Sequence, residues 1–119
     1  MNAPSDDRDL YGGLIRLHIL HHAAEAPLYG QWMIEELQRH GYRIGPGTMY
    51  PLLHGLLSKG YLKAETRQAG SRYRKVYYLT PSGRRALRLA KKRVQELFGE
   101  LFERGEGRER MRNIASRRT

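Results

Sequence analysis

The sequence predicts a mainly α-helical domain with a small β-ribbon: a winged helix-turn-helix followed by a C-terminal dimerisation helix. Three observations support this prediction. Apolar residues recur at helical spacing in three segments before residue 59. The period then changes to the alternation typical of strands between residues 61 and 79. A long segment with coiled-coil-like spacing follows, and a chain of 119 residues has room for one core.

Three helices are expected first. One covers Leu10–Ala24, where leucine and isoleucine recur every three or four residues, and it ends near Pro27. The second covers Tyr29–His40 and ends at Gly41, because glycine commonly follows the last turn of a helix. A Gly-Pro-Gly turn precedes the third helix, at about Thr48–Ser58. The second and third helices would form the helix-turn-helix.

A ribbon and a last helix complete the predicted fold. The segments Tyr61–Gln68 and Arg72–Leu79 alternate as strands around an Ala-Gly-Ser tip. Thr80 is a capping residue before a proline, so the last helix should cover Pro81–Glu103. We therefore expect a disordered N-terminus at residues 1–9, the winged helix-turn-helix DNA-binding domain at 10–80, the C-terminal dimerisation helix at 81–103 and a basic disordered tail at 104–119.

The positive charge of the chain is concentrated in one window. Lys and Arg number 22 against 12 Asp and Glu, a net charge of +10. The segment Lys63–Arg93 contains eleven basic residues and one acidic residue, Glu65, so 11 − 1 = +10 lies in this window. The charges of the remaining chain cancel. A concentrated patch of this kind is typical of a surface that binds a polyanion such as nucleic acid.

Several classes of protein are excluded by composition. The chain has no cysteine, which removes disulfides and thiolate sites and fits a reducing compartment. Its longest uncharged stretch, Ile44–Ser58, contains two prolines and is shorter than the roughly 18 residues of a membrane span. The first nine residues are polar and acidic, unlike a signal peptide. No catalytic set can be assembled, so we expect no enzyme and no cofactor, and the composition fits a cytoplasmic location.

The third helix has one face suited to a DNA groove. Its leucines and Met49 cluster on one side at 100° per residue and should be buried. The opposite side carries small residues, hydroxyls and an imidazole, and it lacks a carboxylate that would repel phosphate. Such a face can enter a major groove and bond to base edges. The residues expected to contact DNA from this helix are Gly47, Thr48, Tyr50, Pro51 and His54.

The ribbon is expected to supply the phosphate contacts that this helix lacks. A hairpin of this kind can reach the phosphate backbone or the minor groove. The basic residues that surround its glycine tip are Lys63, Arg67, Arg72, Arg74 and Lys75. The residues expected to contact DNA from the ribbon are Lys63, Arg72, Arg74 and Lys75. Its tyrosines would stack on unpaired bases if the partner were RNA. A sequence-nonspecific RNA-binding or nucleoid-associated winged helix is therefore an alternative, and a protein–protein module is a second, disfavoured by the charge.

The last helix has the pattern of a dimer interface. Apolar residues recur at 3-4-3-4 spacing and would leave too much apolar surface exposed on a lone helix. We therefore predict a homodimer through Leu87, Ala90, Val94, Leu97 and Leu101.

Three histidines on the first helix raise the question of a metal site. His18 and His22 are one turn apart, and His21 lies between them. They lack a thiolate or a clear carboxylate partner in the sequence, and such a set is weak evidence for metal binding. The sequence therefore predicts no metal site.

Several short motifs also carry a resemblance. They are Leu28-Tyr29-Gly30, Pro46-Gly47-Thr48-Met49-Tyr50-Pro51-Leu52-Leu53, Gly60-Tyr61-Leu62, Lys75-Val76-Tyr77-Tyr78-Leu79-Thr80 and Gly83. Together they resemble the PadR family of bacterial transcriptional regulators, over about Leu10 to Phe102. The resemblance implies a homodimeric winged-helix repressor that binds a palindromic operator in double-stranded DNA. It also implies an aromatic or drug-like inducer bound near the dimer interface, and a bacterial cytoplasmic location at the nucleoid.

Trp32 is the residue expected to bind such an effector. It is the only tryptophan, and at 100° per residue it points away from Ile34 and Leu37, so it is not a simple core position. If the last helix of the partner covered it, a flat aromatic ligand would stack on the indole in the resulting cavity.

Overall fold

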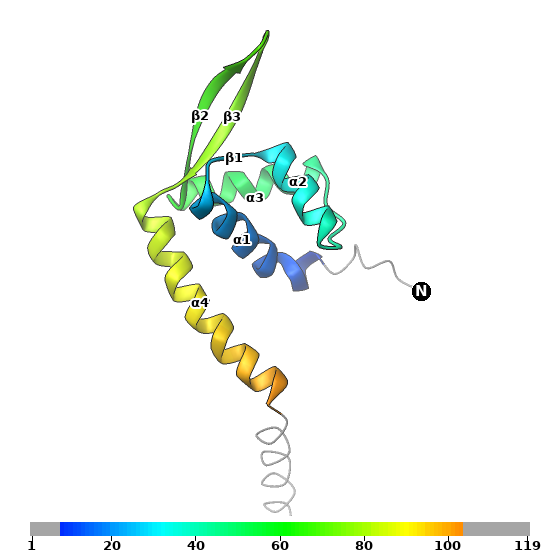
Figure 1. Ribbon diagram of the computed structural model, residues 1–119, viewed down its shortest axis with the longest axis vertical. Helices are drawn as coiled ribbons and strands as arrows, with labels where there is room; N and C mark the ends of the chain where they lie inside the picture. The colour runs from blue at the N-terminus through cyan, green and yellow to red at the C-terminus, as the bar shows by residue number, and fades with distance from the viewer. Residues whose placement is uncertain (1–7, 104–119) are drawn as a thin grey trace, which may run out of the picture. The chain divides into compact units, whose positions relative to one another are not determined.

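A computed structural model describes residues 8–103 and confirms the predicted fold class (Figure 1). The described chain is mainly helical with a small antiparallel sheet. Its elements in chain order are α1 (Arg8–Glu25), β1 (Leu28–Tyr29), α2 (Gly30–Arg39), α3 (Pro46–Ser58), β2 (Leu62–Ala69), β3 (Arg72–Leu79) and α4 (Pro81–Phe102).

Several boundaries differ from the prediction by one or two residues. α1, α2 and α4 end at Glu25, Arg39 and Phe102, each one residue from the expected end. α3 begins at Pro46, so the expected Gly-Pro-Gly turn forms its first turn, and β2 covers Leu62–Ala69 in place of Tyr61–Gln68. The first helix begins at Arg8, so residues 8 and 9 belong to it and not to an unstructured N-terminus ending at residue 9. Tyr29 belongs to a strand, and α2 begins one residue later at Gly30. The remaining N-terminal residues and the predicted tail at 104–119 lie outside the described residues.

The sheet has a third strand that the sequence analysis missed. Its strand order is β1-β3-β2, and both pairings are antiparallel. In β1, Leu28 pairs with Tyr77 and Tyr29 pairs with Val76. Two residues are too short to show an alternating pattern, so only the pairing with β3 identifies this strand. Figure 1 shows the β2–β3 hairpin extending beyond the three helices at its base.

The core lies between α1, α2, α3 and the base of the sheet. Its fully buried side chains come from all three helices, and neighbouring residues of the sheet and the start of α4 close it. Burying such side chains supplies the main driving force for folding. The largest are Ile19, Met33, Leu37, Met49 and Leu53.

A hydrogen-bonded junction joins the ribbon to the start of α4. The backbone N–H of Thr80 donates to the carbonyl of Tyr61 at 3.1 Å, and its hydroxyl donates to the carbonyl of Gly60 at 2.6 Å. The same Thr80 oxygen accepts a bond from the N–H of Gly83 at 2.9 Å, which is the capping bond predicted from the sequence. This junction fixes the direction in which α4 leaves the domain up to Leu87.

The chain divides into two compact units, with the boundary after Leu87. The described part of the second unit is the remainder of α4, a helix with a polar and an apolar side. Within residues 8–103, no helix is long and apolar enough to cross a bilayer.

Candidate nucleic-acid interface

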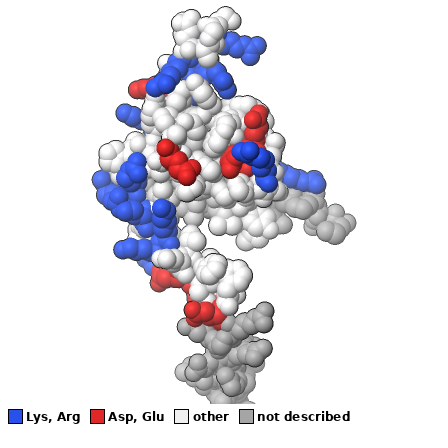
Figure 2. Space-filling view, viewed as in Figure 1, with Lys and Arg blue, Asp and Glu red and all other residues white. Residues whose placement is uncertain are grey.

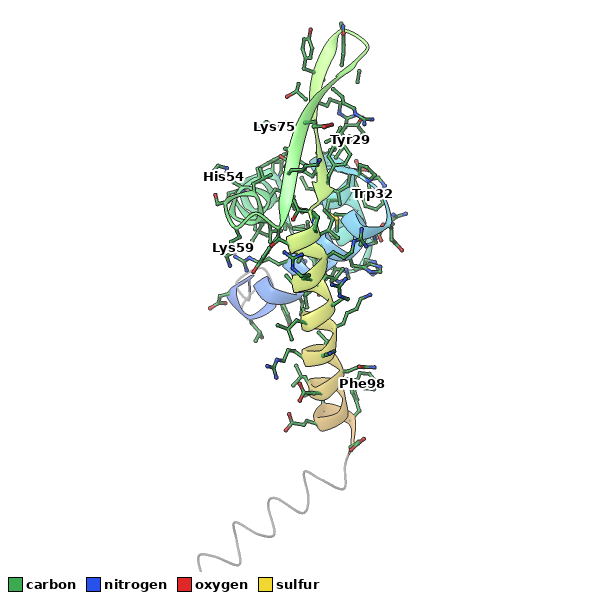
Figure 3. All side chains as sticks on the ribbon, turned by 90° about the vertical axis from the view of Figure 1, so that its left-hand side faces the viewer. Tyr29, Trp32, His54, Lys59, Lys75 and Phe98 are labelled. Carbon is green, nitrogen blue, oxygen red and sulfur yellow. The ribbon has the colours of Figure 1, made fainter. Side chains whose placement is uncertain are left out.

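The helix α3 is anchored by one face and exposes the other. Met49 and Leu53 are completely buried, and Leu56 is 3% exposed. Of the residues predicted to contact DNA from this helix, Gly47, Tyr50, Pro51 and His54 are exposed and Thr48 is half-buried. His54 lies on the outer side of α3 in Figure 3. The segment Pro46–Ser58 contains no charged residue, so nothing on it repels phosphate.

A groove brings the exposed face of α3 and the ribbon together. Its walls include Tyr50, Pro51 and His54 from α3 and residues 73–75 from β3. Tyr77 also lines the groove, and burial, with the neighbouring Tyr50 second, raises the pKa of its phenol. The phenol therefore stays neutral at physiological pH and adds no negative charge to a groove with two cations at its rim.

Tyr50 packs against Gly30 at the start of α2. A Cβ atom at Gly30 would lie 2.7 Å from Cε1 and 2.9 Å from the hydroxyl oxygen of the Tyr50 ring. Only glycine therefore admits the ring in this position, although Tyr50 itself remains 43% exposed. The sequence analysis did not identify Gly30 as a site residue, because only the tertiary fold brings it next to Tyr50.

Four of the five ribbon cations share one face of the hairpin. The register pairs Lys63 with Tyr78, Arg67 with Arg74 and Ala69 with Arg72, and residues paired directly across strands project to the same face. Lys75, paired with Thr66, projects to the other face. All five are exposed, and within residues 8–103 none of them forms an ion pair. Figure 2 shows basic side chains on the hairpin and also on α4.

The pairing of Arg67 with Arg74 is electrostatically unfavourable in the free protein. Like charges directly opposite each other destabilise a sheet, and the ribbon has no acidic neighbour besides Glu65 to compensate. A tyrosine contacts each of the two guanidinium groups. The Arg74 Cζ atom lies 4.2 Å from the centroid of the Tyr29 ring, and Arg67 donates a hydrogen bond to the hydroxyl of Tyr78. A polyanion bound along this face would relieve the repulsion. Sequence reasoning assigned no role to Tyr29 and left Arg67 out of the site.

The last helix exposes most of the predicted dimer interface. The exposed fractions of Val94, Leu97 and Leu101 are 42%, 52% and 65%, and Ala90 is half-buried. Leu87 differs, because it packs in the core of its own domain and is 6% exposed. The open apolar surface of α4 therefore begins after Leu87, and Phe98 and Phe102 widen it with rings whose centroids are 4.7 Å apart.

Trp32 is a partly exposed residue of α2. Its side chain is 42% exposed, in keeping with its predicted position away from the core. Its ring and the imidazole of His22 on α1 pack edge to face, with centroids 5.3 Å apart and planes at 78°. Figure 3 shows Trp32 on the opposite side of the ribbon base from His54.

Comparisons with known proteins agree on one family. A profile described as the transcriptional regulator PadR-like family matches residues 19–89. The chain is 47% identical over 95 residues to "Transcriptional regulator Rv3488" of Mycobacterium tuberculosis, a match that covers 80% of this chain and 89% of the relative.

Solved structures of related proteins have the same fold. A PadR family transcriptional regulator from Eggerthella lenta is 34% identical with a TM-score of 0.69, covering 81% of this chain and 88% of that one. The protein smu.1704 from Streptococcus mutans is 30% identical with a TM-score of 0.73, covering 80% and 89%.

Proposed function

This chain belongs to the PadR-like family of transcriptional regulators, and on that premise we propose that it is a homodimeric repressor of a palindromic operator. Membership in the family makes it a DNA-binding regulator of transcription. One observation carries the finer proposal: the uncharged outer face of α3 lies in one groove with a ribbon whose cations have no ion-pair partner within residues 8–103.

The two surfaces contact different parts of the DNA. The hydroxyl and imidazole groups of Tyr50 and His54 project from α3 and can bond to base edges in a major groove. The ribbon cations then reach phosphates on the flanking backbone, which position the protein without reading sequence. A dimer repeats this arrangement about a two-fold axis, so the operator should be a palindrome.

Selection of bound fragments from random duplex DNA tests this function. We expect an enriched sequence with two-fold symmetry and half-sites about one helical turn apart, roughly 34 Å. Binding that shows no enriched sequence, or that is equally tight for RNA, would instead favour the sequence-nonspecific RNA-binding or nucleoid-associated alternative. Repression is then tested with a reporter gene placed behind the selected sequence, where the protein should lower expression.

Removing two ribbon cations should flatten the salt dependence of binding. Each phosphate contact contributes about −0.9 to the slope of log affinity against log salt. The variant Arg72→Ala with Arg74→Ala removes two cations per protomer, so the slope should fall by up to about 3.6 in a dimer, with all DNA sequences weakened alike. Titrations at several salt concentrations measure this. As a control, Arg39→Ala at the end of α2 should keep the wild-type slope. An unchanged slope in the double variant would show that the ribbon does not contact the phosphates.

The substitution Gly30→Ala should weaken DNA binding without unfolding the protein. The new methyl group would displace the Tyr50 ring, which is half-exposed and free to move outward. We expect a loss of operator affinity of about tenfold, or about 1.4 kcal/mol, similar to that of Tyr50→Ala. Gly13→Ala on α1, where an added Cβ meets nothing within 4 Å, is the matched control. Wild-type affinity in Gly30→Ala would show that the ring position does not matter for binding.

Trp32 is proposed as the effector contact. Its exposed indole can stack with a planar aromatic compound that releases the protein from DNA. We expect such an inducer to quench Trp32 fluorescence at the same midpoint concentration at which it releases DNA. Trp32→Ala should fold, bind DNA and no longer respond. A variant that still responds at the same concentration would place the effector site elsewhere.

A further inference from the structure

Two pairs of polar side chains face each other between α1 and α2. His18 and His22 are one turn apart on α1, and Glu36 and His40 have the same spacing at the end of α2. One ligand atom from each of the three histidines lies within 4.8 Å of the others. The Oε2 atom of Glu36 lies 3.6 Å from Nε2 of His22 and 3.1 Å from Nε2 of His40. His40 and Glu36 are the partners that the sequence analysis did not associate with the α1 histidines.

We propose that His18, His22, His40 and Glu36 bind a divalent transition-metal ion of the Zn²⁺ class. Imidazoles and a carboxylate are ligands that Zn²⁺, Ni²⁺ and Cu²⁺ accept, and four of them complete a tetrahedral shell. Two histidines at i and i+4 on a helix are a recurrent zinc-binding arrangement. Bonds of about 2.0–2.1 Å place tetrahedral ligand atoms roughly 3.3 Å apart. The ligand atoms of the three histidines lie up to 4.8 Å apart, so metal binding requires side-chain rotation, for which the 50% exposed His40 has room.

The surroundings prepare these groups for a cation. Burial, followed by the nearby His40, His22 and His21, lowers the pKa of His18, while Glu36 acts in the opposite direction. Arg39 bonds to the other carboxylate oxygen of Glu36, Oε1, which orients the carboxylate and leaves Oε2 toward the histidines. Partners of this kind fix metal ligands in place.

The neighbouring group His21, His22 and Glu25 is the weaker candidate. All three residues lie on α1, and adjacent residues of a helix do not face each other. Apart from the shared His22, the side chains of this group are 50% and 61% exposed, whereas those of Glu36 and His40 are 13% and 50% exposed. The half-buried cluster that joins two helices therefore offers the better enclosed site.

The ion would connect α1 to the end of α2. His40 is the C-terminal capping residue of α2, and Gly45 is the N-terminal capping residue of α3. Residues 41–45 therefore separate the proposed ligand His40 from α3, the helix that carries the proposed DNA-contacting face.

Titration of the untagged full chain with Co²⁺, followed by Zn²⁺, tests the site. We expect one Co²⁺ per chain with the visible absorption bands of tetrahedral coordination, which Zn²⁺ displaces. Ni²⁺ or Cu²⁺ should quench Trp32, because the only tryptophan of the chain lies 5.3 Å from the His22 ring. His18→Gln and His40→Gln should each lower Co²⁺ affinity by more than about tenfold.

His21→Gln and His54→Gln are the matched controls and should bind Co²⁺ as the wild type does. If His18→Gln fails to fold, the Co²⁺ affinity of His40→Gln tests the proposal, because His40 is half-exposed. Its circular dichroism, compared with that of the metal-free wild type, shows whether this variant is folded. Absence of the tetrahedral bands in the wild type would overturn the proposal. Loss of binding in His21→Gln with full binding in His40→Gln would equally overturn it and assign the ion to the α1 group.

Discussion

Replacing Val94 and Leu97 by glutamate is expected to convert a dimer into monomers that no longer hold the operator. The two side chains are 42% and 52% exposed on α4, within the apolar surface that continues through Leu101. Two carboxylates in such an interface would be buried without partners, which strongly disfavours association. A monomer contacts a single half-site, so operator affinity should fall by at least about 100-fold. Sedimentation velocity and DNA titration measure both effects.

A charge-matched control separates this interface from a general charge effect. The variant Gln95→Glu with Gly99→Glu adds the same two charges on another side of α4, where a Cβ at residue 99 meets no atom closer than 3.8 Å. It should remain dimeric. If the Val94 and Leu97 double variant still sediments as a dimer, the predicted interface on α4 is wrong and another surface joins the protomers.

Gly83→Ala is expected to destabilise the whole domain. A Cβ atom at this buried position would lie 2.1 Å from the backbone oxygen of Tyr61 and 2.7 Å from Cδ1 of Leu79. The backbone oxygen cannot move without breaking its bond to the N–H of Thr80. We expect the free energy of unfolding to fall by about 3 kcal/mol or more, which lowers Tm by roughly 12 °C or more for a domain of this size.

Gly99→Ala on the same helix is the control, and we expect it not to destabilise the protein. Its new methyl group has space, and alanine is favoured over glycine inside a helix by up to about 1 kcal/mol, so stability should stay equal or rise. Thermal unfolding of both variants by circular dichroism makes the comparison. Wild-type stability in Gly83→Ala would show that the junction between the ribbon and α4 accommodates the added methyl group without loss of stability.

The helices and the ribbon were predictable because each has enough residues to show a period. The leucines of α3 predict its buried face, and Met49 and Leu53 are indeed completely buried. The prediction of two strands around Gly70 is confirmed, with Arg72–Leu79 matching the observed strand. The capping role of Thr80 is confirmed by its bond from the N–H of Gly83. All these features depend on neighbours within a few residues in the chain.

Features that join distant segments could not be read from the sequence. The strand β1 has two residues and exists through its pairing with β3. Leu87 fits a dimer pattern by spacing, yet it packs in the core of its own domain. His18 and His40 lie 22 positions apart in the chain, but the packing of α1 beside α2 brings their rings to 5.2 Å.

The sequence by itself therefore determined the order and type of the elements, the uncharged face of α3 and the concentration of charge in Lys63–Arg93. Periodicity, caps and charge are local properties, and each is written in consecutive residues. Only the tertiary structure decided that Arg67 lies opposite Arg74, that Gly30 seats the ring of Tyr50, and that Glu36 of α2 lies beside His22 of α1. These contacts arise from strand register and helix packing, which depend on how the whole core closes.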